Sequence, residues 1–161
     1  MGYWLVGEAP TRDNPEHPED TVTPDDSGLP TLGNRLLAMT GWSRTEFLAV
    51  FQVRTTVWKR HWPLWMPEGK QRVRRIVEDA EEAQGVVLVG HMAADAFGLK
   101  GEPLFEWIGR YAVVPHPAPT RLHRYWNLPG MREKAAQFFG GILKAHHASI
   151  PRRRARAARR A

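Results

Sequence analysis

Two short apolar runs, each closed by a glycine, constrain the fold of this 161-residue chain most strongly. The first extends from Tyr3 to Val6 and is followed by Gly7; the second begins at Gly85 and is closed by Gly90. Continuous apolar runs of this length are typical of strands that are buried on both faces, and such strands belong to parallel sheets covered by helices. The chain is therefore expected to form an α/β fold.

Helices and two further strands are expected around these runs. Helical spacing of apolar residues occurs in segments 32–39, 45–50, 68–83, 92–97 and 131–144, and segments 49–53 and 110–115 have the composition of strands. Strands that alternate with helices are typical of βα units. The pattern predicts one domain over residues 1–150, with a central parallel sheet of about four strands.

Composition excludes several classes of site. The chain has no cysteine, which excludes disulfides, thiolate zinc sites, cysteine-ligated iron–sulfur clusters and thiol nucleophiles. No apolar run approaches the roughly 20 residues of a membrane helix, and the amino terminus does not resemble a signal peptide. We expect a cytoplasmic protein that does not associate with membranes.

Charge is distributed very unevenly along the chain. Six arginines in the last ten residues account for the whole formal net charge of +6: Arg152, Arg153, Arg154, Arg156, Arg159 and Arg160. Segment 11–30 is acidic and rich in proline, which predicts a mobile loop. Segment 151–161 is expected to be a disordered tail that either binds nucleic acid or is simply solvated.

Polar side chains follow each expected strand. Glu8 follows the first, Thr55 and Thr56 the second, His91 the third and His116 the fourth. The carboxyl ends of parallel strands meet at one edge of a sheet, which is where α/β folds bind ligands. Glu8 taken alone could equally cap a helix or face solvent, and His91 could make only local hydrogen bonds. A carboxylate and a histidine converging from separate strands nevertheless indicate a functional site.

Two motifs at this edge resemble the uracil-DNA glycosylase superfamily. Segment 7–10, Gly-Glu-Ala-Pro, resembles the first motif of its iron–sulfur-containing bacterial and archaeal branch, and segment 116–120, His-Pro-Ala-Pro-Thr, resembles the second catalytic motif, His-Pro-Ser. Segments 28–33, 86–97 and 126–127 are similar in pattern. The resemblance covers roughly residues 3–145 and implies a three-layer α/β/α sandwich with a base-sized pocket at the carboxyl edge of its parallel sheet.

This resemblance implies hydrolysis of the N-glycosidic bond of a uracil-related, mispaired or modified base in DNA, without a metal or cofactor. Glu8 would position water and stabilise the oxocarbenium-like sugar, and His116 would donate a hydrogen bond to the departing base. The nucleotide would be flipped out of the duplex. The partner would be DNA, and the protein is expected to be a monomer.

The matching positions supply the other predicted site residues. Substrate-binding residues would be Gly7, Ala9, Pro10, Thr31, Thr56, His91, Pro117, Ala118 and Asn127. DNA-binding residues would be Thr120, Arg121, Leu122, Arg124, Arg152, Arg153 and Arg154.

Four of these positions depart from the family's pattern. Thr31 stands where the family has a stacking aromatic ring, and Thr56 where an asparagine reads uracil. Ala118 replaces the serine of the second motif, and Thr120 replaces a wedge leucine for which Leu122 could substitute. A threonine cannot make the two contacts of an amide. Either the pocket therefore accepts another base, such as a damaged or modified pyrimidine, or the protein binds nucleic acid or nucleotides without catalysis.

Overall fold

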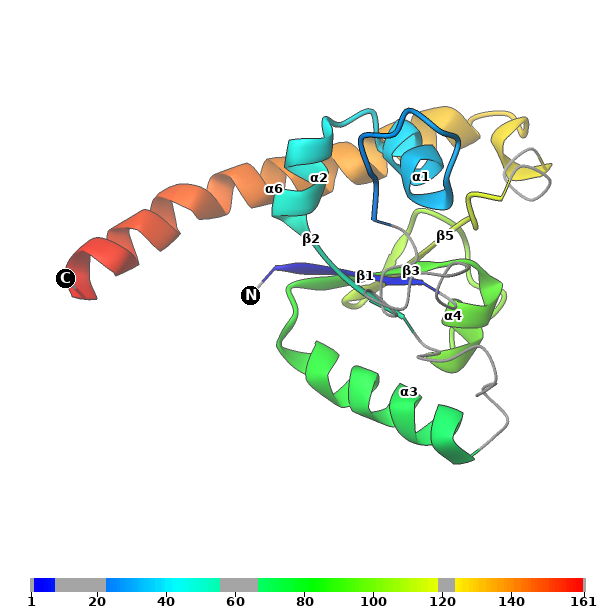
Figure 1. The fold of residues 1–161 in the computed structure, drawn as a ribbon, viewed down its shortest axis with the longest axis horizontal. Helices are drawn as coiled ribbons and strands as arrows, with labels where there is room; N and C mark the ends of the chain where they lie inside the picture. Colours follow the sequence, from blue (N-terminus) through cyan, green and yellow to red (C-terminus); the bar gives the residue numbers. More distant parts are fainter. Residues whose placement is uncertain (1, 8–22, 56–66, 119–123, 161) are drawn as a thin grey trace.

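The computed structural model describes residues 2–7, 23–55, 67–118 and 124–160 and shows a mixed α/β fold around a five-stranded, mostly parallel sheet (Figure 1). The parallel strands are β1 (Tyr3–Gly7), β2 (Phe51–Thr55), β3 (Gly85–Val89) and β5 (Tyr111–Val114). A short strand, β4 (Trp107–Ile108), pairs antiparallel with β5, and the order across the sheet is β2-β1-β3-β5-β4. The expected α/β fold is confirmed. Strand β4 was not predicted, because two residues carry no readable periodicity.

The helices agree with the expected segments to within a few residues, except at the carboxyl terminus. They are α1 (Leu32–Thr40), α2 (Arg44–Val50), α3 (Pro67–Asp79), the 3₁₀ helix η1 (Ala80–Glu82), α4 (His91–Ala96) and α6 (Met131–Arg160). The prediction of a strand over 49–53 was two residues too early. Ala49 and Val50 belong to α2, and the backbone becomes extended only at Phe51.

Apolar side chains pack on both faces of the sheet. On one face, Leu5 and Val87 join residues of α1, α2 and α6 in a cluster that contains Leu36, Phe47, Phe138, Phe139 and Ile142. On the other face, Val6 and Leu88 pack with residues of η1 and α4, including Ala80, Ala93 and Ala94. Adjacent residues of one strand thus pack in clusters on opposite faces of the sheet. Both faces of the strand are buried, which is why these strands are apolar throughout. The arrangement is compatible with an α/β sandwich.

The described part of the segment before α1 is an irregular loop that hydrogen bonds join to the helix. Residues 11–22 of the predicted mobile segment 11–30 lie outside the described residues, whereas 23–30 are held by hydrogen bonds. Asp25 Oδ1 accepts hydrogen bonds from Ser27 N at 3.0 Å and Asn34 Nδ2 at 2.8 Å, and Asp25 N donates to Asn34 Oδ1 at 2.9 Å. The hydrogen bond from the Ser27 side chain, followed by that from Asn34, lowers the pKa of Asp25. These bonds join segment 23–30 to the first turn of α1, and the predicted mobility of the loop stays a prediction.

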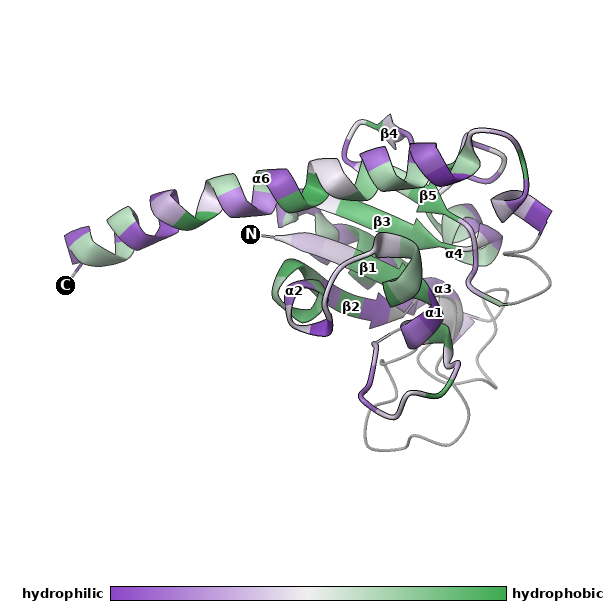
Figure 2. Ribbon diagram, turned by 90° about the horizontal axis from the view of Figure 1, so that it is seen from above, coloured by the Kyte–Doolittle hydropathy of each residue, from purple (hydrophilic) through white to green (hydrophobic). Residues whose placement is uncertain are grey.

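The carboxyl-terminal segment differs from the prediction. Residues 151–160 of the expected disordered tail are helical and belong to α6. Alanine and arginine are strong helix formers, and a helix that is already nucleated by packed residues extends at little cost. Pro151 lies inside the helix, where a proline removes one amide donor and crowds the carbonyl four residues before it, so the helix continues past Pro151 at a cost. Figure 2 shows that α6 begins over the sheet and continues beyond it, where hydrophilic (purple) residues alternate with weakly hydrophobic (pale green) ones.

Candidate functional site

Strand order places a topological switch point at the carboxyl ends of β1 and β3. The chain moves from β1 to β2 on one side and then returns to β3 on the other side of β1. Such a point creates the crevice in which open α/β sheets bind ligands. The register aligns the strand ends, since Gly7 pairs with Thr55, Val6 with Leu88 and Val89 with Val114. Segments that follow these strands therefore start from one edge.

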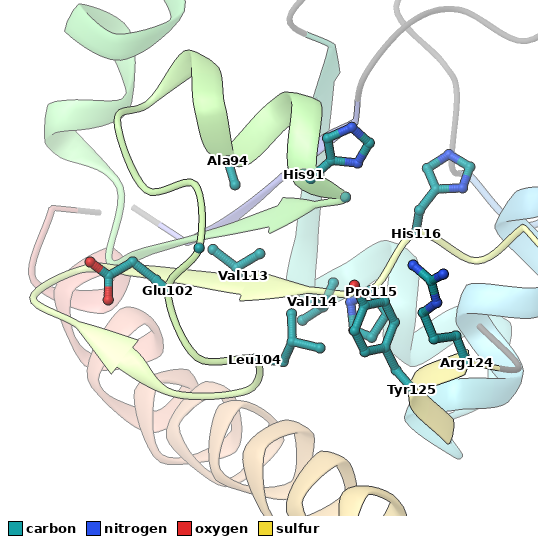
Figure 3. A pocket seen from close by; sticks show the side chains of 12 residues that line it. His91, Ala94, Glu102, Leu104, Val113, Val114, Pro115, His116, Arg124 and Tyr125 are labelled. Carbon is teal, nitrogen blue, oxygen red and sulfur yellow. The ribbon is translucent and has the colours of Figure 1, made fainter. Parts of the chain in front are cut away.

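Gly90 forms the sharp turn between β3 and α4. Its φ of 89° lies in the left-handed region, where a side chain would strain the backbone, and its N–H donates to Val114 O at 2.9 Å. Because this single residue completes the turn, α4 begins at the next one, His91. His91 is exposed at the edge of the sheet, next to the segment that follows β5 (Figure 3).

His116 follows β5 after the buried residue Pro115 and is itself half-buried. Its ring nitrogen Nδ1 accepts a hydrogen bond from the backbone N–H of Ala118 at 3.1 Å. A backbone N–H can only donate, so Nδ1 must present a lone pair and the ring proton must lie on Nε2. The fold thereby selects the neutral tautomer in which Nε2 is the donor.

A cavity of about 720 Å³ opens beside both histidines (Figure 3). Its volume lies within the range of about 300–1,000 Å³ that is typical of ligand pockets. The residues that line it come from α4, the loop after it, the end of β5 and the helical segment 124–126; they are Gly90, His91, Ala94, Gly101, Glu102, Leu104, Val113, Val114, Pro115, His116, Arg124 and Tyr125. Two imidazoles and a guanidinium around an apolar wall can bind a planar polar ring or an anion.

The structure brings three of the predicted residues together, since His91, His116 and Arg124 all line this cavity. Ala118 acts on His116 through its backbone, and Pro117 is buried between them.

Thr31 and Asn127 have other positions. Thr31 is the N-cap of α1, and its Oγ1 accepts a hydrogen bond from Asn34 N at 3.1 Å. Asn127 is exposed directly after helical segment 124–126. Neither residue is among those that line the cavity.

The remaining predicted residues cannot be placed at this cavity. Gly7 is buried at the end of β1 and is the last residue that the structure describes before Glu8. The following predicted residues lie outside the described part of the chain: Glu8, Ala9, Pro10, Thr56, Thr120, Arg121 and Leu122. Arg152, Arg153 and Arg154 lie on α6, which extends beyond the opposite, amino-terminal edge of the sheet (Figures 1 and 2).

Sequence reasoning missed most of the lining residues. Gly90 and Pro115 directly precede the two predicted histidines, so the same strand-end argument could have identified them. Glu102, Leu104 and Tyr125 come from loops or a short helical segment, where neither periodicity nor a motif marks a side chain. Only tertiary packing brings these three residues to the cavity.

Other classes of site find no support in the described segments. In residues 2–7, 23–55, 67–118 and 124–160, no group of three or more histidine or acidic side chains could hold a metal ion. No helix within these segments is long and apolar enough to span a membrane.

Comparison with known proteins identifies no family. No protein-family model matches the chain, and no curated protein is significantly similar to it.

Proposed function

We propose that this chain is a DNA glycosylase-like enzyme, built on a three-layer α/β/α sandwich, that hydrolyses the N-glycosidic bond of a modified or mispaired base. The observation that carries the proposal is the 3.1 Å hydrogen bond from Ala118 N to His116 Nδ1. It makes His116 a neutral donor through Nε2, next to a cavity large enough for a base. The motif resemblance around His116 and Glu8 supplies the reaction type.

The chemistry needs such a donor. As the bond between the sugar and the base breaks, electron density accumulates on the base and positive charge on the sugar. A fixed Nε2–H donor stabilises the departing base, and removing one donor of this kind from an enzyme costs about 10²–10³ in rate. In the proposed mechanism Glu8 orients a water molecule. The water oxygen forms a bond to the sugar carbon, and the carboxylate of Glu8 accepts a proton from that water. The base leaves with its electron pair and is then protonated.

The cavity offers an aromatic ring from a different segment than the one that stacks on the base in the family. Thr31, which occupies the position of the family's stacking ring, is engaged in capping α1. Among the described lining residues the available aromatic ring is that of Tyr125. We therefore propose that Tyr125 stacks on the base, since aromatic stacking tolerates a range of ring substituents. We expect Arg124, on the same helical segment, to contact a neighbouring phosphate, because its guanidinium can donate two parallel hydrogen bonds to one.

A panel of oligonucleotides tests this function. Single-stranded and duplex substrates would carry uracil, thymine opposite guanine, hypoxanthine, or oxidised and hydroxymethylated pyrimidines, and alkali-labile sites would be scored. We expect release of at least one modified pyrimidine, abolished in Glu8→Ala and His116→Ala.

Two outcomes would refute the catalytic assignment. One is that no base is released; the other is that release persists undiminished in both variants. Tight binding of the same oligonucleotides without release would instead identify a non-catalytic nucleic-acid-binding protein. Leu48→Ala, at an exposed residue of α2, provides a matched control for handling and folding.

A further inference from the structure

The carboxyl-terminal third of α6 is a part of the fold that the cavity does not use. Helix α6 has 30 residues and is therefore about 45 Å long. Its buried residues, Ala135, Phe138, Phe139 and Ile142, all lie in its first half, whereas residues 151–160 are all exposed. Figures 1 and 2 show this end of α6 extending past the amino-terminal edge of the sheet. Residues 151–160 thus have no packing role in the domain.

This exposed segment is basic along one side. No acidic residue occurs between Lys134 and Arg160. At about 100° per residue, five arginines fall within roughly 120° of the helix circumference. We call this set the arginine face; it consists of Arg152, Arg153, Arg156, Arg159 and Arg160. The residues around the rest of the circumference are mainly alanines, together with Arg154.

The arginine face has unfavourable electrostatics when it is alone. Arg156 is four residues from both Arg152 and Arg160, and like charges at this spacing destabilise a helix. The negative end of the helix dipole offsets part of the repulsion at the last turn. Since no carboxylate lies on this segment, a partner that supplies negative charges along the face would stabilise the helix.

We propose that the arginine face binds the phosphate backbone of a nucleic-acid duplex, at a segment separate from the one that enters the cavity. Arginine is the side chain best suited to phosphate, because its planar guanidinium donates two parallel hydrogen bonds. A lipid surface fits less well, because a helix that lies in a membrane interface needs large apolar residues opposite its charges. Here the residues outside the face are mainly alanines.

The direction of α6 makes this second contact distinct from the cavity. His116 follows the carboxyl end of β5, whereas the arginine face lies beyond the amino ends of the strands (Figure 1). The helix therefore holds the duplex at one end of the molecule while the cavity faces the other. Such a tether raises the local concentration of nucleic acid around the protein without contributing to base recognition.

Fluorescence anisotropy with an unmodified DNA duplex at several salt concentrations tests the proposal on the full chain. The binding constant for DNA falls as salt rises, so log K against log salt has a negative slope. Replacing all five residues of the arginine face and Arg154 by glutamine should make this slope less steep by up to about 5, since each phosphate contact contributes about 0.9. Replacing the same residues by lysine should preserve most of the slope. Arg74→Gln with Arg75→Gln, at exposed positions of α3, is the control and should leave the slope unchanged.

Several results would overturn the proposal. The first is an unchanged slope and affinity in the glutamine variant. The second is tighter binding of the wild-type protein to phosphatidylserine vesicles than to the duplex, which would assign the face to a membrane surface. The third is tighter binding to a polyglutamate peptide, which would assign it to an acidic protein. The duplex contains no base to be excised, so a failure of the proposed catalytic function would not affect these measurements.

Discussion

Replacing His116 by asparagine or by glutamine separates the roles of its two ring nitrogens. An asparagine amide reaches about as far as Nδ1 and can still accept the hydrogen bond from Ala118 N, which measures 3.1 Å in the native protein. A glutamine amide reaches about as far as Nε2 and can donate to a base, but it gives up the bond to Ala118. The two variants therefore each keep one half of the native arrangement.

The expected magnitudes differ accordingly. His116→Asn loses the donor and should slow base release by about 10²–10³. It should keep the free energy of unfolding, because the bond to Ala118 is retained. His116→Gln should be less impaired in release than His116→Asn, and it should lose about 0.5–1.5 kcal/mol of stability with the Ala118 bond.

Single-turnover release, with enzyme in excess over the oligonucleotide, measures the bond-breaking step without interference from product release. The substrate is the base that the oligonucleotide panel identifies. Imidazole nitrogen chemical shifts provide a second measurement that needs no substrate, and they should show the proton of His116 on Nε2. Wild-type rates in His116→Asn, or a proton on Nδ1 in the native protein, would refute the assigned role.

Three further predictions concern stability. Phe139 is fully buried against α1, α2 and the sheet, so Phe139→Ala should cost about 3–5 kcal/mol in urea unfolding; Leu128→Ala, at an exposed site, should change stability by less than about 0.5 kcal/mol. A Cβ on Gly33 would collide with the backbone carbonyl of Thr23, so Gly33→Ala should cost about 1–3 kcal/mol and expose the segment before α1 to limited proteolysis; unchanged stability would contradict the close packing. Burial, followed by the charges of Arg153 and His147, lowers the pKa of His146. The stability that neutral His146 contributes is therefore present above the unfolded pKa of about 6.5 and is lost as the pH falls through the lower folded pKa. Thermal unfolding of His146→Gln should depend less on pH between these two pKa values than that of the wild type.

Some features of the fold were readable because a short local pattern specifies them. The apolar run at Gly85–Val89 is buried at every position, as a strand covered on both faces must be. Helices α1 and α3 followed from helical spacing, and Gly41 ends α1 in the left-handed conformation, as a glycine at that position predicts. In these segments local preference and tertiary packing favour the same conformation.

One missed feature and one error occurred where composition alone was used. Segment 23–30 was predicted to be part of a loop from its prolines and acids, and the hydrogen bonds between Asp25 and Asn34, nine positions apart, were not predicted. Segment 151–160 was predicted to be disordered, yet its arginines and alanines continue a helix that starts in the core. Composition describes neither a specific hydrogen bond nor the structure of the preceding residues.

The sequence by itself determined the α/β class, most of the strands and the two histidines that follow strands, because each depends on residues close together in the chain. It also determined the concentration of positive charge at the carboxyl terminus. Only the tertiary structure decided the strand order, the cavity that joins His91 and His116 to Tyr125, and the direction in which α6 carries its arginines. These features depend on which distant segments pack together, and packing energy is spread over many weak apolar contacts that no short motif encodes.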